Sequence, residues 1–425
     1  HMWPSDEEQL HEGIVSPVWG TPTSETVSRL PDLPVITVNH ASGQWLRQQA
    51  ETGPVNVRLF TKVDTAWRRQ LLPVADIPGR SSRFVLAAGH IDSWHLGATD
   101  NATGNVACLE LARVFWKHRS QLERGVRIVW WPGHSTGRYA GSTWYADHAW
   151  QDLYQNCIAY INIDSPGSRG ATDYSQITAM AENAGFACGL VSELTGQTVH
   201  WERPERAGDQ SFWGHGITSI FMLLSNRPEG QRAKVGGSGM GWWWHTEWDT
   251  LDKVDMKVQV LDTQIHATAI ARLATVPVLP YRMADLATEV NGLLSALAPT
   301  AQGHLDMNMA VQAAGALVSV AKTFDAAAQV AGRSARRRHV ANDAMLSVLR
   351  LLIPVNYTAS GQFEHDPAIP LRPLPGLARL HELPRLAGKP DYGFLKTYLT
   401  RQRNRVVYAL REATHVLETA VAKLG

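Results

Sequence analysis

The sequence has little cysteine, little excess charge and no long apolar run, and each of these features argues against a class of protein. Its three cysteines, Cys108, Cys157 and Cys188, are odd in number and lack metal-type spacing, which favours a reducing compartment over a disulfide framework. Forty basic and 39 acidic residues leave a net charge of +1, so there is no electrostatic case for a nucleic-acid partner or an anionic membrane. No uninterrupted apolar run is long enough to span a bilayer.

The start of the chain also lacks a targeting signal. HMWPSDEEQLHEG carries neither the basic region nor the apolar core of a signal peptide, so we expect a cytoplasmic protein. What the chain does have is length and apolar content. Its 425 residues are 44% hydrophobic, enough for two or three structural units with sizeable cores.

Between residues 84 and 275, short apolar runs alternate with stretches of helical spacing. Each run is predicted to be a buried strand: Phe84–Ala88, Val126–Trp131, Cys157–Asp164 and Ser219–Leu224. Repeated strand–helix units predict an α/β fold, with a mixed, mostly parallel sheet sandwiched by helices.

Metal-capable side chains follow the first of these strands. In FVLAAGHIDSWHLGATDNATG, His90 and Asp92 come at the end of the strand, and Asp100 lies in the Gly- and Asn-rich turn that follows. Polar side chains at the carboxyl end of a strand occupy the place where open α/β sheets carry their sites. An imidazole and carboxylates gathered there suit a borderline cation such as zinc.

This stretch resembles the family-28 metallopeptidases, a group of co-catalytic zinc aminopeptidases, glutamate carboxypeptidases and transferrin-receptor-like proteins. The resemblance implies that His90 binds one of two metals, that Asp100 bridges both, and that Asp92 supports His90 without binding metal. Two later matches extend it: Asp164 corresponds to a further ligand of the first metal, and His245, in a His-Thr-x-x-Asp-Thr motif, to a ligand of the second. The implied cofactor is zinc, as one or two ions, with another divalent metal as the alternative. The implied sheet is of the eight-stranded mixed type.

One motif of the family is missing. After its second core strand the family has two adjacent glutamates before a Gly-x-x-Gly-Ser turn; the first is the general base and the second binds metal. Here the stretch is WWPGHSTGRYAGSTWYA, in which His134 and Ser135 stand in about that place and no glutamate occurs. Three readings are open: His134 replaces the metal ligand, His134 replaces the base, or catalysis is lost as in the receptor members. If the base is lost, proton transfer must use His134, another carboxylate such as Glu247, or solvent.

The segment Glu205–Met222 resembles the part of the family that lines the substrate pocket. Arg206 is expected to face a substrate carboxylate bidentately. The candidate substrate-binding residues are Arg206, Asp209, Gln210, Phe212 and Trp244.

The flanking regions resemble accessory domains. Residues 1–80 are predicted to be a partial protease-associated-like segment, with short strands around one helix between Pro34 and Gly79. Residues 81–280 are the metallopeptidase-like catalytic domain. Residues 281–425 contain three stretches of helical apolar spacing and resemble a dimerisation domain, so we expect a homodimer.

These features predict a metal-dependent hydrolase of amide or peptide bonds that is aminopeptidase-like but has an atypical active site. The candidate catalytic residues are His134 and Asp92, and the expected substrate is a small peptide or amide. The alternative is a non-catalytic, receptor-like or binding protein of the same fold.

Overall fold

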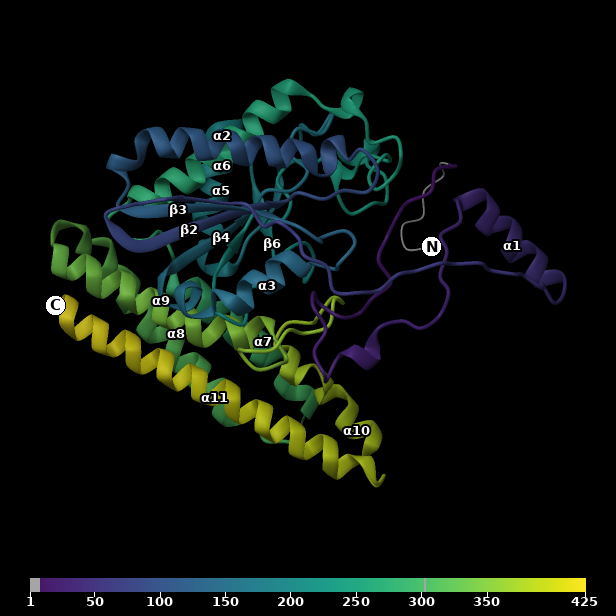
Figure 1. The fold of residues 1–425 in the computed structure, drawn as a ribbon. Coiled ribbons are helices and arrows are strands. Elements are labelled where there is room, and N and C mark those ends of the chain that lie inside the picture. Colours follow the sequence, from purple (N-terminus) through teal and green to yellow (C-terminus); the bar gives the residue numbers. More distant parts are fainter. Residues whose placement is uncertain (1–7, 302) are drawn as a thin grey trace.

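The computed structural model describes residues 8–301 and 303–425, and its centre is a mixed sheet with helices on both faces (Figure 1). The strand order is β1-β3-β2-β4-β7; β1 runs antiparallel to β3, and the other neighbours are parallel. The predicted α/β class is confirmed, although this sheet has five strands in the described residues rather than eight. A separate two-stranded sheet pairs β5 with β6. The strands are β1 (Val74–Ile77), β2 (Ser81–His90), β3 (Arg124–Trp131), β4 (Cys157–Asn162), β5 (Gln176–Thr178), β6 (His200–Glu202) and β7 (Ser219–Ile220).

The central strands are buried on both faces, which explains their continuous apolar sequence. In β2, Val85 and Ala87 belong to one hydrophobic cluster, while Phe84, Leu86 and Ala88 belong to another. Successive side chains of a strand point to opposite faces, so both faces of a sandwiched parallel strand demand apolar residues. The predicted strand Ser219–Leu224 is shorter than expected, because only Ser219 and Ile220 pair with β4.

Helices cover the two faces. Residues of α2, α5 and α6 share a hydrophobic cluster with one face of the sheet, and residues of α3 and α4 share one with the other face. Asp255 caps the start of α6, where its side chain accepts the N–H groups of Lys257 and Val258. Gly196 caps the end of α5 in the left-handed conformation that favours glycine. These helices are α2 (Thr103–His118), α3 (Ala140–His148), α4 (Trp150–Asn156), α5 (Ala181–Thr195) and α6 (Met256–Thr275).

The predicted helical region packs directly against this sandwich (Figure 1). Buried Arg350 fixes the contact, since its guanidinium donates to the main-chain oxygens of Tyr154, Cys157 and Gly216. The helices are α7 (Met283–Leu297), α8 (Asn308–Gln329), α9 (Ala335–Tyr357), α10 (Leu383–Leu386) and α11 (Asp391–Leu424). The homodimer expected from this region stays a prediction.

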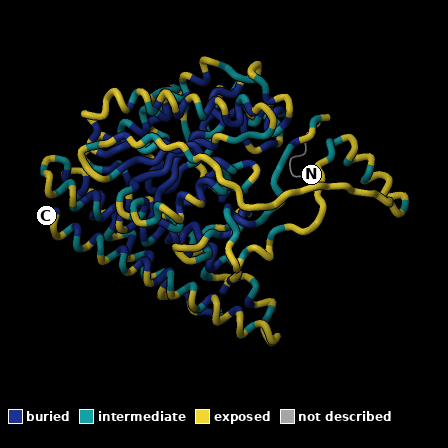
Figure 2. Tube along the Cα trace, in the orientation of Figure 1, coloured by how far each residue is buried: buried dark blue, intermediate teal, exposed yellow. Residues whose placement is uncertain are grey.

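The segment from residue 31 to residue 73 lies largely exposed beside the body of the molecule (Figure 2). It contains α1 (His40–Thr52), which is the expected helix, but none of the described residues 31–73 forms a strand. The short strands predicted around this helix are therefore wrong, apart from β1, which joins the main sheet. The signal-peptide argument concerned residues 1–13, of which 1–7 lie outside the described residues. Across the described part of the chain, no helix combines the length and the apolarity needed to cross a membrane.

Candidate metal centre

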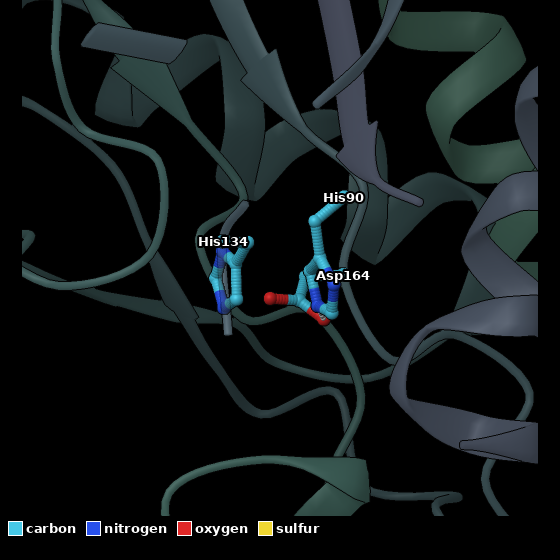
Figure 3. A group of neighbouring side chains, drawn as sticks. All are labelled: His90, His134 and Asp164. Atoms are coloured by element: carbon cyan, nitrogen blue, oxygen red, sulfur yellow. Dashed lines mark ion pairs between the residues drawn. The ribbon is translucent and has the colours of Figure 1, made fainter. Parts of the chain in front are cut away.

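Three neighbouring parallel strands end at the same edge of the sheet and bring together three metal-capable side chains. His90 is the last residue of β2, His134 follows β3 by three residues, and Asp164 follows β4 by two. Each offers one ligand atom, and these three atoms lie within 4.8 Å of one another. Figure 3 shows the Asp164 carboxylate close to the two imidazole rings. The parallel topology thus explains how residues 74 positions apart share one site.

Asp100 lies between His90 and His245. It comes from the turn Ala98–Ala102, which connects β2 to α2. Its Oδ1 lies 3.0 Å from His90 Nε2, and its Oδ2 lies 3.1 Å from His245 Nε2. The Oδ1 atom of Asp164 lies 3.4 Å from the same His90 nitrogen. One carboxylate facing two imidazoles through separate oxygens is the arrangement expected of a bridging ligand.

Main-chain oxygens hold both imidazoles in this orientation. The Nδ1 atom of His90 donates to the main-chain oxygen of Asp92 at 2.7 Å, and Nδ1 of His245 donates to that of Glu12 at 2.8 Å. With Nδ1 bound to a carbonyl, Nε2 is the ring nitrogen that each imidazole directs toward Asp100. Such second partners are what orient the histidine ligands of metal sites.

Burial and opposite charges give this cluster unusual protonation. Burial disfavours the charged form of His90, but the carboxylates of Asp164 and Asp100 outweigh it and raise the pKa of His90 well above its usual range. Burial also opposes ionisation of Asp100, yet His245 and His90 hold the pKa of that carboxyl well below its usual value. The Asp100 carboxyl is thus held as an anion, and an anion in a buried site needs compensation by cations.

The donor set fits divalent metal ions. Two donors about 2.1 Å from one tetrahedral ion lie roughly 3.4 Å apart. The nitrogen–oxygen distances of 3.0–3.4 Å among His90, Asp100, Asp164 and His245 agree with that spacing. Imidazole and carboxylate together match the ligand preference of zinc. Asp100 faces His90 with one oxygen and His245 with the other, so the donors form two adjoining groups. All four predicted ligands other than His134 therefore belong to one constellation.

The Asp92 carboxylate acts differently from the prediction. Its two oxygens accept the main-chain N–H groups of His134 at 3.0 Å and Ser135 at 2.8 Å. Only the main-chain oxygen of Asp92 supports His90. The side chain therefore shapes the turn that carries His134, and it does not orient the His90 ring.

His134 is partnered by Asp209. Its Nδ1 donates to Asp209 Oδ2 at 2.8 Å, and the other oxygen of Asp209 accepts the Ser142 hydroxyl at 2.8 Å. Asp209 is buried, with 1% of its surface exposed. Asp209 was expected to line a substrate pocket; the structure instead makes it the partner of His134.

Two other predicted substrate-binding residues, Arg206 and Phe212, make their contacts within the protein itself. Buried Arg206 donates to the main-chain oxygens of Asp366 and Pro367, so its guanidinium is bound by the protein's own backbone. Phe212 is fully buried and packs between Trp131 and Tyr160, so it belongs to the core.

The remaining candidates differ from one another. Trp244 is largely buried and stacks on His245, with ring centroids 3.6 Å apart, so it supports the ring of a candidate ligand. Gln210 is fully buried, and neither polar atom of its amide has a hydrogen-bond partner within the described residues. Glu247, the alternative proton acceptor, is exposed.

Two supporting elements were not predicted from the sequence. The Asp249 carboxylate accepts the main-chain N–H groups of Thr99 and Asp100, both at 2.9 Å, and the Thr99 hydroxyl at 2.7 Å. It therefore holds the turn that presents Asp100. Asp249 is the aspartate of the His-Thr-x-x-Asp-Thr motif, so the motif pointed to this residue without revealing its role.

The second element is the N-terminal strap, defined here as residues 11–20. It begins beside His245, where the Glu12 N–H donates to the main-chain oxygen of His245 at 2.8 Å. At its other end, Trp19 donates to Ser211 and packs against Tyr139, whose ring lies edge-on to that of His134. The strap thus contacts both histidine loops, a long-range arrangement that no local sequence pattern marks.

Comparisons with known proteins include a family match over the part of the chain that holds this cluster. Residues 74–268 match the model of Peptidase family M28, which confirms the resemblance seen in the sequence. The chain is 25% identical over 370 residues to a probable glutamate carboxypeptidase, VP8 of Zea mays, covering 74% of this chain and 47% of that protein. It is 23% identical over 325 residues to the aminopeptidase NAALADL1 of Mus musculus, covering 65% of this chain and 41% of that protein. The chain thus spans about half the length of the curated relatives it matches.

Among solved structures, a peptidase M28 precursor from Shewanella amazonensis aligns with a TM-score of 0.45 and 18% identity. The alignment covers 65% of this chain and 59% of that chain.

Proposed function

Because residues 74–268 match the model of Peptidase family M28, we propose that this protein is a metal-dependent hydrolase of peptide or amide bonds with aminopeptidase-like chemistry. One observation carries the proposal: the Asp100 carboxylate faces His90 through one oxygen and His245 through the other, at 3.0 and 3.1 Å. Relatives named as an aminopeptidase and a probable glutamate carboxypeptidase support the same reaction type.

The cofactor in this proposal is zinc at two adjoining positions. His90, Asp100 and Asp164 would hold one ion, and Asp100 and His245 would take part in holding a second. Bound there, such ions lower the pKa of water and polarise a carbonyl group, which is the chemistry that amide hydrolysis requires.

The residues of the chain supply orientation and charge. The main-chain oxygens of Asp92 and Glu12 fix the two imidazoles, and Asp249 fixes the turn that carries Asp100. No glutamate stands in the turn after β3, so an ordinary carboxylate base is missing there. We therefore expect slow turnover of standard aminoacyl anilides and faster turnover of some other small peptide or amide.

The test combines metal analysis with a substrate panel. Protein purified without added zinc is analysed for bound metal, stripped with a chelator and reloaded, and each form is assayed on aminoacyl anilides, dipeptides and activated amides. We expect bound metal and a hydrolysis that the chelator abolishes and zinc restores.

Two substitutions provide the matched comparison. Asp164→Asn removes one ligand carboxylate and should reduce both metal content and rate, whereas Asp147→Asn changes a half-exposed carboxylate bound to His365 on the surface and should change neither. A folded protein that takes up no metal and hydrolyses nothing would support the alternative, a non-catalytic binding protein.

A further inference from the structure

His134 and Asp209 form a hydrogen-bonded pair that is not among the proposed metal ligands. Asp209 is buried, and both of its oxygens are used, one by His134 Nδ1 and the other by the Ser142 hydroxyl. Ser142 also contacts Ser211, which accepts the indole N–H of Trp19 from the strap. A buried carboxylate held by this chain of hydrogen bonds gives the His134 ring a fixed orientation.

The orientation of the ring argues against His134 sharing a metal ion with His90. The two imidazoles are stacked, with centroids 3.8 Å apart and planes only 8° from parallel. A nitrogen lone pair lies in the plane of its ring, so an ion about 2 Å from one ring's nitrogen stays near that ring's plane. Such an ion lies well outside the parallel plane of the other ring.

The distances point the same way. His134 lies in the group whose ligand atoms fall within 4.8 Å of one another, yet among the described residues its ion-pair contact is with Asp209 and not with Asp164. The ligand set itself has the closer spacing of 3.0–3.4 Å. His134 therefore stands slightly farther from the ligand set than its members stand from one another.

The protonation pattern completes the picture. With Nδ1 donating to Asp209, the neutral imidazole carries its lone pair on Nε2, the nitrogen left to face the site. In enzymes that use histidine as a base, a buried carboxylate accepts the hydrogen of one ring nitrogen. The other ring nitrogen then accepts a proton, and the carboxylate stabilises the resulting cation.

We propose that His134 is the proton acceptor of the hydrolysis and that Asp209 is its positioning residue; this inference rests on the proposed function. The O–H bond of the attacking water breaks, its proton moves to His134 Nε2, and the oxygen forms a bond to the carbonyl carbon of the amide. When the carbon–nitrogen bond breaks, the same proton passes from Nε2 to the leaving amine. Asp209 takes no part in the proton transfer, and His134 ends the cycle as it began.

The first experiment separates a proton acceptor from a metal ligand. His134→Ala is compared with the wild type for metal equivalents, for the visible spectrum after Co²⁺ replaces zinc, and for rate. We expect unchanged metal content, an unchanged spectrum and a kcat lower by about 10²–10⁴-fold, with partial recovery in added imidazole. Loss of one metal equivalent or an altered Co²⁺ spectrum would overturn the proposal in favour of a ligand role. An unchanged rate would also overturn it.

The second experiment tests Asp209 without relying on turnover alone. In Asp209→Asn the amide can donate to Nδ1 and so shift the proton to Nε2, which ¹⁵N-histidine NMR of the metal-free protein detects as a change of tautomer. We expect that change, together with a lower kcat and an unchanged KM. Asp147→Asn makes the same chemical change in the surface pair with His365, where the two atoms are 2.8 Å apart, and should leave kcat unchanged.

The outcomes distinguish this inference from the proposed function. If His134 keeps its Nδ1 proton and kcat is unchanged in Asp209→Asn, the positioning role is refuted while the hydrolase stands. If the wild-type protein binds no metal or hydrolyses nothing, the proposed function itself fails. Both variants are checked for folding by circular dichroism, and Asp209→Glu, which keeps the carboxylate, should recover part of the rate lost in Asp209→Asn.

Discussion

Asp249→Asn should weaken metal binding although Asp249 is not a ligand. In the wild type one oxygen of Asp249 accepts both the N–H and the hydroxyl of Thr99, and the other accepts the N–H of Asp100. The asparagine oxygen can keep the bonds to Thr99, but its NH₂ group then faces the Asp100 N–H. Two donors confront each other in a buried place, because Asp249 is only 1% exposed.

The size of the effect follows from that lost hydrogen bond. Leaving a buried N–H unsatisfied costs about 1–3 kcal/mol. The metal-free protein can avoid this cost by moving Asp100 away. Metal binding then has to bring Asp100 back, so the cost is subtracted from the binding free energy. At about 1.4 kcal/mol per factor of ten, the metal affinity should fall roughly 5- to 100-fold.

The measurement is a competition titration of the metal-free protein against a chromophoric zinc chelator. Asp252→Asn is the control, since this nearby carboxylate is exposed and bonds only to Thr250 and Lys253 among the described residues. Equal affinities for the wild type and a well-folded Asp249→Asn variant would refute the argument. An equal loss in Asp252→Asn would show that the effect is not specific to the Asp100 turn.

Three further predictions concern stability, local order and assembly. Burial raises the pKa of Glu182 to about 7 from its ordinary 4.5, so between these values the folded protein holds a proton that the unfolded chain has lost. The free energy of unfolding should therefore fall by about 3 kcal/mol as pH rises from 4.5 to 7; urea unfolding should show this slope reduced in Glu182→Gln and kept in the exposed Glu193→Gln. Asp92→Ala removes the acceptor of the His134 and Ser135 N–H groups and should speed hydrogen exchange in that turn. Exchange as slow as in the wild type would contradict this prediction. We also propose that the helical region joins two copies of the chain; light scattering at low concentration should give a dimer mass, and a monomer mass would dismiss this assembly.

Much of the sheet was predictable because its strands are buried on both faces. Apart from Arg127, the runs around Val85, Val129 and Ile161 are apolar, which is what a parallel strand between two helical layers requires. The positions of two candidate ligands were predictable for a related reason. His90 and Asp164 follow such strands directly, so their place at the edge of the sheet follows from the strand order.

Other parts depended on contacts between distant segments. Arg206 and Phe212 lie in a segment that resembles a pocket lining, but their surroundings come from residues 366–367 and from the core strands. The partnership of His134 with Asp209 joins residues 75 positions apart through the fold alone. The strand prediction for residues 31–73 failed differently: the sequence has strand-like alternation, but no neighbouring strand pairs with it among the described residues.

The main-chain acceptors at this site give its histidines an uneven kind of robustness. His245 is held by the carbonyl of Glu12, and His90 by the carbonyl of Asp92. A carbonyl belongs to every amino acid, so no replacement of the Glu12 side chain can delete the acceptor that His245 uses. What this acceptor does depend on is the intact backbone of the strap. If a protease cut the strap once, between Glu12 and Trp19, the Glu12 carbonyl would no longer be joined to Trp19 through the chain, and His245 could lose its acceptor.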